Sequence, residues 1–251
     1  KFFSRFNPNV PIIITNHQTA EMIKYAHNTF LATKISFINQ IANICQGIPD
    51  TNIDDVANTM GLDPRIGNLF LNAGPGYGGS CLPKDIKAII NLSSKLGVNP
   101  TLLTAVEKIN KQQISHIVTL VKQNIGKING KKLTILGIAF KPDTDDIRNS
   151  VSIDLVKRLL KLGAKITIHD PKALENARKI FHDNTKYVKS VPSALKDCQC
   201  AIIMTQWKDY EKINNKTIKQ MAKKFIIDTR RVLYNKNLDA KYYAIGLGQK
   251  I

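Results

Sequence analysis

The sequence has no run of about 18 uncharged apolar residues, the length that a membrane-spanning helix needs. No signal peptide is recognisable either, because Lys1 and Arg5 interrupt the phenylalanines near the start. Cysteine is scarce, with four residues, and Cys198-Gln199-Cys200 is one residue tighter than a metal knuckle and has no second pair. We therefore predict a protein of the reducing cytoplasm that holds no metal and no membrane segment.

Acidic residues are also few: 19 aspartates and glutamates face 37 lysines and arginines, which gives a formal net charge of +18. Such a surplus can bind nucleic acid by releasing phosphate counterions. However, seven of the basic residues are arginine, the lysines are scattered, and no motif combines basic and aromatic residues for stacking. We predict no nucleic-acid partner. The positive field suits a substrate with two phosphates, and a lysine-rich compositional bias would produce the same surplus.

Neither proline nor glycine occurs between His17 and Gln46, and apolar residues recur there at roughly helical spacing. Gly47 is a stop signal, so the pattern predicts one long helix. We expect shorter helices near 52–60 and 64–70, a helix over 83–96 and a second long helix over 101–124. Residues 17–126 are thus predicted to form an all-helical domain. Residues 1–16, with Pro8 and Pro11, are predicted to be the remnant of a preceding domain or a linker.

After a lysine-rich linker, the pattern changes to short apolar runs separated by helices, which is typical of βαβ units. The runs are 133–140, 166–168, 201–204, 225–227 and 242–245, and a helix is expected over 151–162. Parallel strands with crossover helices form a three-layer domain, so residues 127–251 are predicted to be Rossmann-like. The predicted fold class is α/β, with an all-helical central domain followed by this parallel-sheet domain.

The most informative segment runs from Gly76 to Asp85 and has the sequence GYGGSCLPKD. Its glycines permit positive φ and the close approach of another molecule, and Pro83 suits the first turn of a helix. Cys81 would then lie at a helix N-terminus with Lys84 nearby, and both features favour a thiolate. The pattern predicts a nucleophilic cysteine, and a buried, inert cysteine in a glycine-rich loop is the alternative.

Residues 74–79 also satisfy G-x-G-x-x-G, the fingerprint of dinucleotide-binding sites. That fingerprint requires a preceding strand and an acidic residue about 20 positions later. A helical segment is expected before Gly74, and the next acidic residue is Asp85. The first predicted strand of the second domain is followed by a single glycine, Gly137. Neither segment is predicted to form a complete NAD site.

Four separate segments resemble segments of the UDP-glucose/GDP-mannose dehydrogenase family. They are the active-site motif at 76–85, the central helix at 21–39, the segment at 61–68 and the loop at 140–150. The resemblance extends from residue 17 to the end of the chain. It implies a dimerisation domain and a UDP-sugar-binding domain, while the family's amino-terminal NAD-binding domain has no counterpart in the sequence. A fragment of a dehydrogenase is the resulting expectation.

The resemblance implies catalytic roles for four residues. Cys81 would carry the covalent intermediate, and Asp85 would help to activate water. Lys24 and Asn28 would stabilise and orient a developing oxyanion. Their spacing places Lys24 and Asn28 on one helix face, where solvated polar residues are the alternative. On spacing alone, Asp85 is equally a residue that complements the helix dipole.

Further residues are implied to contact the substrate or the cofactor. Arg65 would reach the substrate across a dimer interface, although pairing with Asp63 is the alternative, and Arg148 would reach NAD. The aspartates at positions 143, 145 and 146 suggest a metal site at first sight, but capping of the following helix is the preferred interpretation. The residues implied in substrate binding are Arg65, Tyr77, Gly78, Lys84, Lys141 and Arg230.

The activity that the resemblance implies is a four-electron oxidation of a sugar C6 alcohol to a carboxylate by NAD, through a thiohemiacetal and a thioester on Cys81. UDP-glucose is the predicted substrate, and a homodimer through the long helix is predicted. GDP-mannose and UDP-N-acetylhexosamine are alternative substrates. A different class of function also stays open, in which the chain is a dimeric module that binds nucleotide sugars without catalysis.

Overall fold

The computed structural model describes residue 5 and residues 9–249, so most of the first eight residues of the predicted tail lie outside the described part. The helices are α2 (His17–Cys45), α3 (Ile53–Gly61), α4 (Leu82–Lys95), α5 (Thr101–Ile125), α6 (Val151–Lys161), α7 (Leu174–Phe181), α8 (Val191–Leu195) and α9 (Asn215–Ile218). The strands are β1 (Lys132–Leu136), β2 (Lys165–His169), β3 (Thr185–Tyr187), β4 (Cys200–Ile203), β5 (Phe225–Asp228) and β6 (Lys241–Ala244). Within the described residues, no helix combines the length and the apolar composition that crossing a membrane requires.

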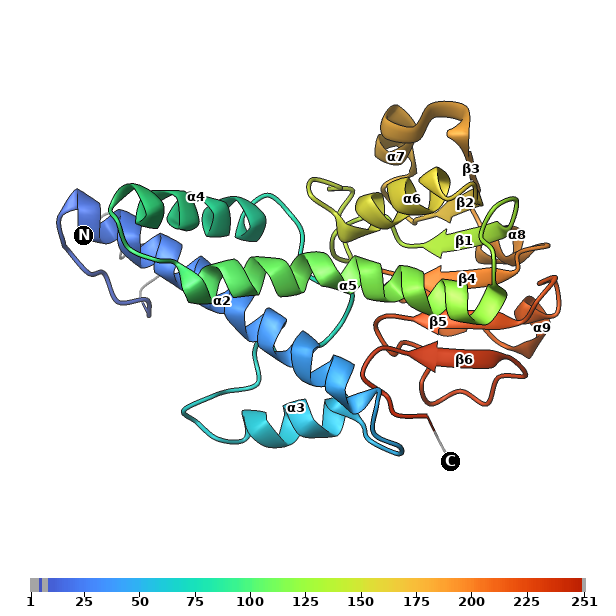
Figure 1. Cartoon of the computed structure of the whole chain (residues 1–251), viewed down its shortest axis with the longest axis horizontal. Coiled ribbons are helices and arrows are strands. Elements are labelled where there is room, and N and C mark those ends of the chain that lie inside the picture. The colour runs from blue at the N-terminus through green and yellow to red at the C-terminus, as the bar shows by residue number, and fades with distance from the viewer. Residues whose placement is uncertain (1–4, 6–8, 250–251) are drawn as a thin grey trace.

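The helical part of the molecule, α2 to α5, is built on α2, which packs against the other three helices (Figure 1). The Asn16 side chain begins α2 by accepting a hydrogen bond from the Thr19 N–H at 2.8 Å. Four of the predicted helical segments are confirmed as α2 to α5. The helix expected over 64–70 is wrong, because that segment consists of turns in which Gly67 and Phe70 adopt positive φ.

The sheet part contains six parallel strands in the order β3-β2-β1-β4-β5-β6. This is the order of a doubly wound fold, whose switch point lies between β1 and β4. The predicted α/β class is therefore confirmed. Strand β3 has no counterpart among the predicted runs, since its three residues, Thr-Lys-Tyr, do not form an apolar run. Strand β1 ends at Leu136 rather than at Phe140, because Gly137 adopts a φ of 97° and turns the chain.

Two clusters of buried apolar side chains hold the molecule together. The larger cluster contains the sheet, its covering helices and the carboxy-terminal halves of α2 and α5. The smaller cluster consists of Ala32, Tyr77, Ile86 and Val106. Helix α5 contributes Val106 to the smaller cluster and Ile117 to the larger one, so it joins the helical and sheet parts along its length (Figure 1). The domain boundary expected at residue 126 stays a prediction.

Candidate active site

The glycine loop, residues 74–80, leads directly into α4, and Cys81 is the residue before the first helical position. The Cys81 side chain is exposed, and its sulfur lies 3.7 Å from Ser80 Oγ. The other three cysteines of the chain are buried. The accessible thiol is therefore the one that the sequence predicts to be a nucleophile, and the alternative of a buried Cys81 does not hold.

One helical turn after Cys81, the carboxylate of Asp85 is completely buried and binds three side chains. Its Oδ2 accepts hydrogen bonds from Lys24 Nζ at 2.9 Å and from Asn28 Nδ2 at 2.6 Å. Its Oδ1 accepts a hydrogen bond from Lys84 Nζ. The Asp85 N–H donates to the Cys81 carbonyl at 2.9 Å, which fixes the intervening turn. Three predicted catalytic residues thus converge one turn from the thiol.

The donors around Asp85 determine its charge. Burial alone would raise the pKa of this carboxyl, but the hydrogen bonds from Lys84, Lys24 and Asn28 outweigh burial and lower the pKa to about 2. The pKa of Lys84 is raised, first by its hydrogen bond to Asp85 and in smaller part by the charge of Cys81. Lys84 therefore lies within electrostatic range of the Cys81 sulfur, although Asp85 is the group that it contacts.

Beside the glycine loop lies a cleft of about 350 Å³ between the helical and sheet parts. Four of the six predicted substrate-binding residues line it: Tyr77, Gly78, Lys141 and Arg230. The remaining lining residues are Ile35, Leu69, Phe70, Asn72, Gly76, Leu82 and Phe140. Because Gly78 and Leu82 flank Cys81 in the sequence, the loop that carries Cys81 forms one wall of this cleft.

Arg230, at the end of β5, lies directly beneath the glycine loop. A Cβ added at Gly74 would lie 2.6 Å from Arg230 Nη1, so a side chain at position 74 would displace the guanidinium from its present place. Burial, and then the charge of Arg231, lowers the pKa of Arg230 to about 10, which leaves the guanidinium charged at neutral pH. Among the described residues, its side chain donates to the Met204 carbonyl at 3.5 Å and forms no ion pair. A half-buried cation without a carboxylate partner suits an anionic ligand.

The loop after β1 holds Lys141 and Arg148. Lys141 Nζ lies 5.6 Å from the centroid of the Phe140 ring, at the cleft, whereas Arg148 is exposed and donates to both carboxylate oxygens of Asp146. The expectation that the aspartates of this loop cap the next helix is wrong, because Ser150 begins α6 and accepts from the Ser152 N–H. No cluster of potential metal ligands occurs in the part of the chain that the structure describes.

Arg65 lies away from the residues that line the cleft of its own chain. Its side chain is 88% exposed and forms a fork with Asp63, with 2.6 Å between Nη2 and Oδ2. This hydrogen bond raises the pKa of Arg65 and lowers that of Asp63. The pairing that the sequence offers as an alternative is thus present, and a contact of Arg65 with substrate in a second copy stays a prediction.

The segment after β1 does not offer free backbone N–H groups to a dinucleotide. The N–H groups of Ile138 and Ala139 donate to Asp170 Oδ2 at 2.7 and 3.0 Å, and Asp170 is itself buried at the end of β2. The glycine loop, for its part, follows turns rather than a strand. The described residues therefore do not fit NAD as a complete site, and a contact of Arg148 with NAD stays a prediction.

Arg231 lies beside the glycine loop and joins the two parts of the molecule, and no pattern in the sequence identifies it. Its side chain is 5% exposed, and its Nε donates to Asp54 Oδ2 of α3 at 2.7 Å. Its Nη2 donates to the carbonyl of Ala73, at the start of the glycine loop, at 3.0 Å. Arg231 thus ties the sheet part to the helical part beside the cleft. Two adjacent arginines give no signal in the sequence to indicate which one forms such a bridge.

Two models of one family match the chain. The UDP-glucose/GDP-mannose dehydrogenase family, central domain, matches residues 18–112, and the UDP binding domain of the same family matches residues 134–235. The chain is 42% identical over 240 residues to a UDP-glucose 6-dehydrogenase of Rickettsia felis, with 93% of the chain and 53% of that protein covered. It is 39% identical over 242 residues to the UDP-glucose 6-dehydrogenase TuaD of Bacillus subtilis, with 95% and 52% covered.

The chain therefore spans about half the length of the curated relatives that it matches. Among solved structures, a UDP-glucose dehydrogenase from the hyperthermophilic archaeon Pyrobaculum islandicum is similar, with a TM-score of 0.89 and 33% identity. That similarity covers 98% of this chain and 56% of the archaeal chain. The two family models include the helix of Lys24, the glycine loop and the cleft cations. The chain belongs to the UDP-glucose/GDP-mannose dehydrogenase family.

Proposed function

We propose that this chain provides the nucleophile and the UDP-sugar site of a UDP-glucose 6-dehydrogenase, which oxidises the C6 alcohol of UDP-glucose to a carboxylate. The names of relatives that are 39% and 42% identical support this choice of substrate. One observation carries the proposal. An exposed thiol lies one helical turn before a buried carboxylate that holds a lysine and an amide.

The cleft supplies suitable groups for a nucleotide sugar. Arg230 and Lys141 offer two cations for the diphosphate, and a guanidinium can bind phosphate through two parallel hydrogen bonds. Tyr77 and Gly78 form the wall next to the nucleophile, where glycine permits close approach of the sugar. Lys84, on the first turn of α4, would approach the sugar end of the substrate from the side of Asp85.

The chemistry needs a nucleophile because an aldehyde has no hydride that leaves readily until a group adds to its carbon. The Cys81 thiolate would form a sulfur–carbon bond with C6, while the carbonyl electron pair moves to oxygen and gives a thiohemiacetal. Loss of hydride from that carbon gives a thioester. Attack by water then forms the carboxylate and breaks the sulfur–carbon bond, which returns the electron pair to Cys81. Lys24 and Asn28 would donate to the oxyanion in these steps.

Asp85 has two roles in this scheme. With a pKa of about 2 it is a weak base while all three donors are in place, and it holds Lys24 and Asn28 in position. If Lys24 turns towards the substrate oxygen, the carboxylate loses one stabilising hydrogen bond and its proton affinity rises. The pair Asp85 and Lys24 would then promote the attack of water on the thioester.

Two molecules of NAD would accept the two hydrides, one lost from the C6 alcohol and one from the thiohemiacetal, which is the oxidising chemistry of the reaction. Of the described residues, Arg148 is the one that we assign to NAD, and its guanidinium is exposed beside the loop that contacts Gly79. The pKa of Arg148 is raised, first by its hydrogen bond to Asp146 and in smaller part by the charge of Cys81. The cation therefore lies within electrostatic range of the nucleophile. The cysteine must be a free thiol, which fits the reducing cytoplasm as the compartment.

A homodimer through α2 completes the proposal. Four large apolar side chains follow one another at seven-residue intervals on this helix, and each is about half exposed: Ile23, Phe30, Phe37 and Ile44. Seven-residue spacing keeps side chains on one face of a helix, so α2 carries a continuous apolar stripe. A second copy presents the same stripe, and two such helices related by a two-fold axis would cover each other. Arg65 would then be available to the cleft of the second copy.

Isothermal titration calorimetry with UDP-glucose, GDP-mannose, UDP-N-acetylmannosamine and NAD tests the proposal on this chain. We expect UDP-glucose to bind most tightly, and we expect NAD to bind weakly or not at all. Tighter binding of GDP-mannose or of the N-acetylated sugar would replace the proposed substrate. Binding of UDP-glucose without reactivity of Cys81 towards its 6-aldehyde would favour the alternative of a binding module.

A further inference from the structure

The peptide groups of the glycine loop are held from two sides by asparagines. In the helical part, the side chain of Asn110 on α5 forms two hydrogen bonds with the backbone of Tyr77. Its Oδ1 accepts from the Tyr77 N–H at 2.8 Å, and its Nδ2 donates to the Tyr77 carbonyl at 3.1 Å. The Asn110 amide thus forms the two backbone hydrogen bonds with Tyr77 that a neighbouring β-strand would otherwise form.

The sheet part holds Gly79 in the same manner. The Gly79 N–H donates to the Arg148 carbonyl at 3.0 Å, and Asn149 Nδ2 donates to the Gly79 carbonyl at 3.1 Å. Asn149 adopts a φ of 48°, a left-handed conformation that costs energy in residues other than glycine. The peptide groups of Tyr77 and Gly79 are therefore fixed by opposite parts of the molecule, four and two residues before Cys81.

The approach of these segments is too close for other residues in the loop. A Cβ on Gly78 would lie 2.4 Å from the Asn149 carbonyl oxygen, and a Cβ on Gly76 would lie 2.6 Å from Asn110 Oδ1. Two glycines of the active-site motif are thus required by the asparagines behind the loop. The same two glycines line the proposed substrate cleft on the opposite side.

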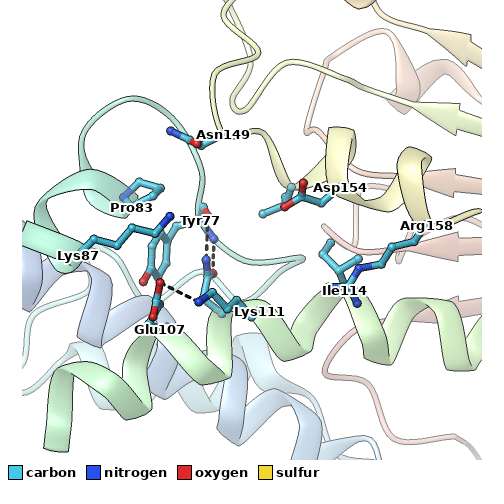
Figure 2. Close-up of a pocket in the computed structure, with 11 residues that line it drawn as sticks. Tyr77, Pro83, Lys87, Glu107, Lys111, Ile114, Asn149, Asp154 and Arg158 are labelled. Carbon is cyan, nitrogen blue, oxygen red and sulfur yellow. Dashed lines mark hydrogen bonds and ion pairs between the residues drawn. The ribbon is translucent and has the colours of Figure 1, made fainter. Parts of the chain in front are cut away.

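The ring of Tyr77 packs in the smaller apolar cluster, but beside it the loop borders an open space. A cavity of about 150 Å³ lies there among α4, α5 and α6 and is lined by Tyr77, Asn110 and Asn149. Figure 2 shows Tyr77 and Asn149 among the side chains that surround it. The Tyr77 hydroxyl is buried and has no hydrogen-bond partner among the described residues. Because the cavity provides no contact atoms on this side, the hydrogen bonds of the asparagines are the contacts that hold the peptide groups of Tyr77 and Gly79 there.

We propose that Asn110 and Asn149 are positioning residues that set the place of the Cys81 thiol, one from each part of the molecule. The proposal rests on the proposed function in that Cys81 is taken to be the nucleophile. A displacement of about 1 Å at a reacting atom is enough to slow a reaction by roughly 100-fold, so small movements of this loop matter. Because Asn149 follows Arg148 directly, the same backbone segment places the cofactor-facing cation and the nucleophile's loop.

The test compares Asn110→Ala and Asn149→Gly with Asn215→Ala as the matched control. Alanine keeps α5 helical and glycine keeps the positive φ, so each variant removes amide hydrogen bonds without opposing the local backbone. In the control, Asn215 also binds backbone at two points, the Asn237 carbonyl and the Asp239 N–H, but far from Cys81 in the sheet part. Circular dichroism establishes that each variant is folded.

The measurement is alkylation of Cys81 by iodoacetamide and by iodoacetate, followed by mass spectrometry of the chain. Cys81 is the exposed cysteine, so the reaction is selective. The rate with iodoacetate divided by the rate with iodoacetamide reports the cations around the thiol, because iodoacetate is an anion and iodoacetamide is neutral. We expect Asn110→Ala and Asn149→Gly each to lower this rate ratio by at least about threefold, because the loop moves away from Arg148 and Lys84.

Asn215→Ala is expected to leave the ratio unchanged. A ratio within twofold of the unmodified chain in both position variants would overturn the proposal, whether or not their thermal midpoints fall. A faster reaction with an unchanged ratio would also overturn it, since the asparagines would then shield the thiol rather than place it. The result is independent of substrate binding, so a failure of UDP-glucose to bind in calorimetry would defeat the proposed function and leave this inference standing.

Discussion

Lys24 Nζ lies 2.9 Å from a carboxylate oxygen of Asp85, and the two side chains differ greatly in exposure, at 56% for the lysine and 0% for the aspartate. The Asp85 carboxylate is buried, whereas the Lys24 ammonium group faces the solvent. Lys24 can therefore turn to a ligand without exposing Asp85, and Asn28 stays on the carboxylate when it does. This asymmetry distinguishes the cluster from an ordinary surface ion pair, in which both partners are solvated.

Asp85 should make folding depend on pH at the acid end. Its pKa in the folded chain is about 2, below the value of about 3.9 expected for an unfolded chain. Its contribution to the free energy of unfolding is therefore fully present above pH 4 and is lost as the pH falls through 2. Both lysines are more than half exposed, so solvent screening reduces the contribution to on the order of 1 kcal/mol.

Urea denaturation of the chain and of Asp85→Asn between pH 2 and 6 would measure this term. The variant should lose stability near pH 6 and should show a flatter pH dependence. Asp63→Asn is the control, because Asp63 also has a lowered pKa but belongs to an exposed pair. Equal pH dependence in the chain and in Asp85→Asn would contradict the expectation.

Cys81 should add to the aldehyde form of the substrate without any cofactor. We expect the chain, incubated with UDP-glucose 6-aldehyde carrying ¹³C at C6, to shift the C6 resonance from that of the free aldehyde and its hydrate to that of a thiohemiacetal. Cys81→Ala should abolish the shifted signal, and Cys45→Ala should keep it, since Cys45 is buried. In a longer protein that includes an NAD-binding domain, Cys81→Ala should abolish uronate formation. Wild-type turnover by that variant would defeat the assignment of the nucleophile.

Arg230 should dominate the binding of the diphosphate. Because its half-buried guanidinium lies beneath Gly74 and forms no ion pair within the described residues, a phosphate would satisfy a charge that is otherwise unpaired. We expect Arg230→Met to weaken UDP binding by about 10- to 100-fold, the range for loss of one buried charged hydrogen bond. Arg178→Met, which removes an exposed arginine beside Tyr187, is the matched control. Calorimetry with UDP gives the result, and unchanged affinity in Arg230→Met would place the diphosphate elsewhere.

The apolar stripe of α2 should determine the oligomeric state. Phe30 is 65% exposed at the middle of the stripe, so a charge there would be buried against the same charge of the second copy. We expect sedimentation equilibrium to show a dimer for the chain and a monomer for Phe30→Asp. Ile180→Asp, at a residue of α7 that is 40% exposed, should leave the dimer intact. A monomeric unmodified chain would rule out α2 as a dimer interface.

Sequence reasoning located the elements whose signals are local. The absence of helix breakers and the stop at Gly47 were enough for α2, and Gly97 for the end of α4. The helix expected over 64–70 is absent from the structure. Phe70 adopts a positive φ there, and the sequence does not predict this because phenylalanine does not favour positive φ. The family resemblance identified Lys24, Asn28 and Asp85, but their convergence depends on the packing of α4 against α2.

The residues that sequence reasoning missed act over long distances along the chain. Asn110 and Asn149 contact the glycine loop from 33 and 70 residues away, and asparagine on a helix or in a loop is ordinarily a solvated residue. Arg231 contacts Asp54 from 177 residues away. Such contacts follow from the assembly of the two parts, which the local pattern of a single sequence does not encode.

Arg231 should hold the helical and sheet parts together through two of its three hydrogen bonds, those to Asp54 and Ala73. Its guanidinium binds Asp54, the Ala73 carbonyl and the Ile245 carbonyl, and its side chain is 5% exposed. Lysine would keep the charge but cannot reach three acceptors with a planar fork, so Arg231→Lys should lower the free energy of unfolding by about 1–3 kcal/mol. Arg65→Lys is the matched control, since Arg65 also donates to an aspartate, Asp63, but at an 88% exposed position, and it should change stability by less than about 0.5 kcal/mol. Thermal and urea unfolding give both values.

Because Arg231 also binds the start of the glycine loop, its loss should loosen that loop before the chain unfolds. Hydrogen exchange at residues 73–80 should therefore rise in Arg231→Lys and stay unchanged in Arg65→Lys. Equal exchange in the two variants would mean that the bridge stabilises the molecule without supporting the site.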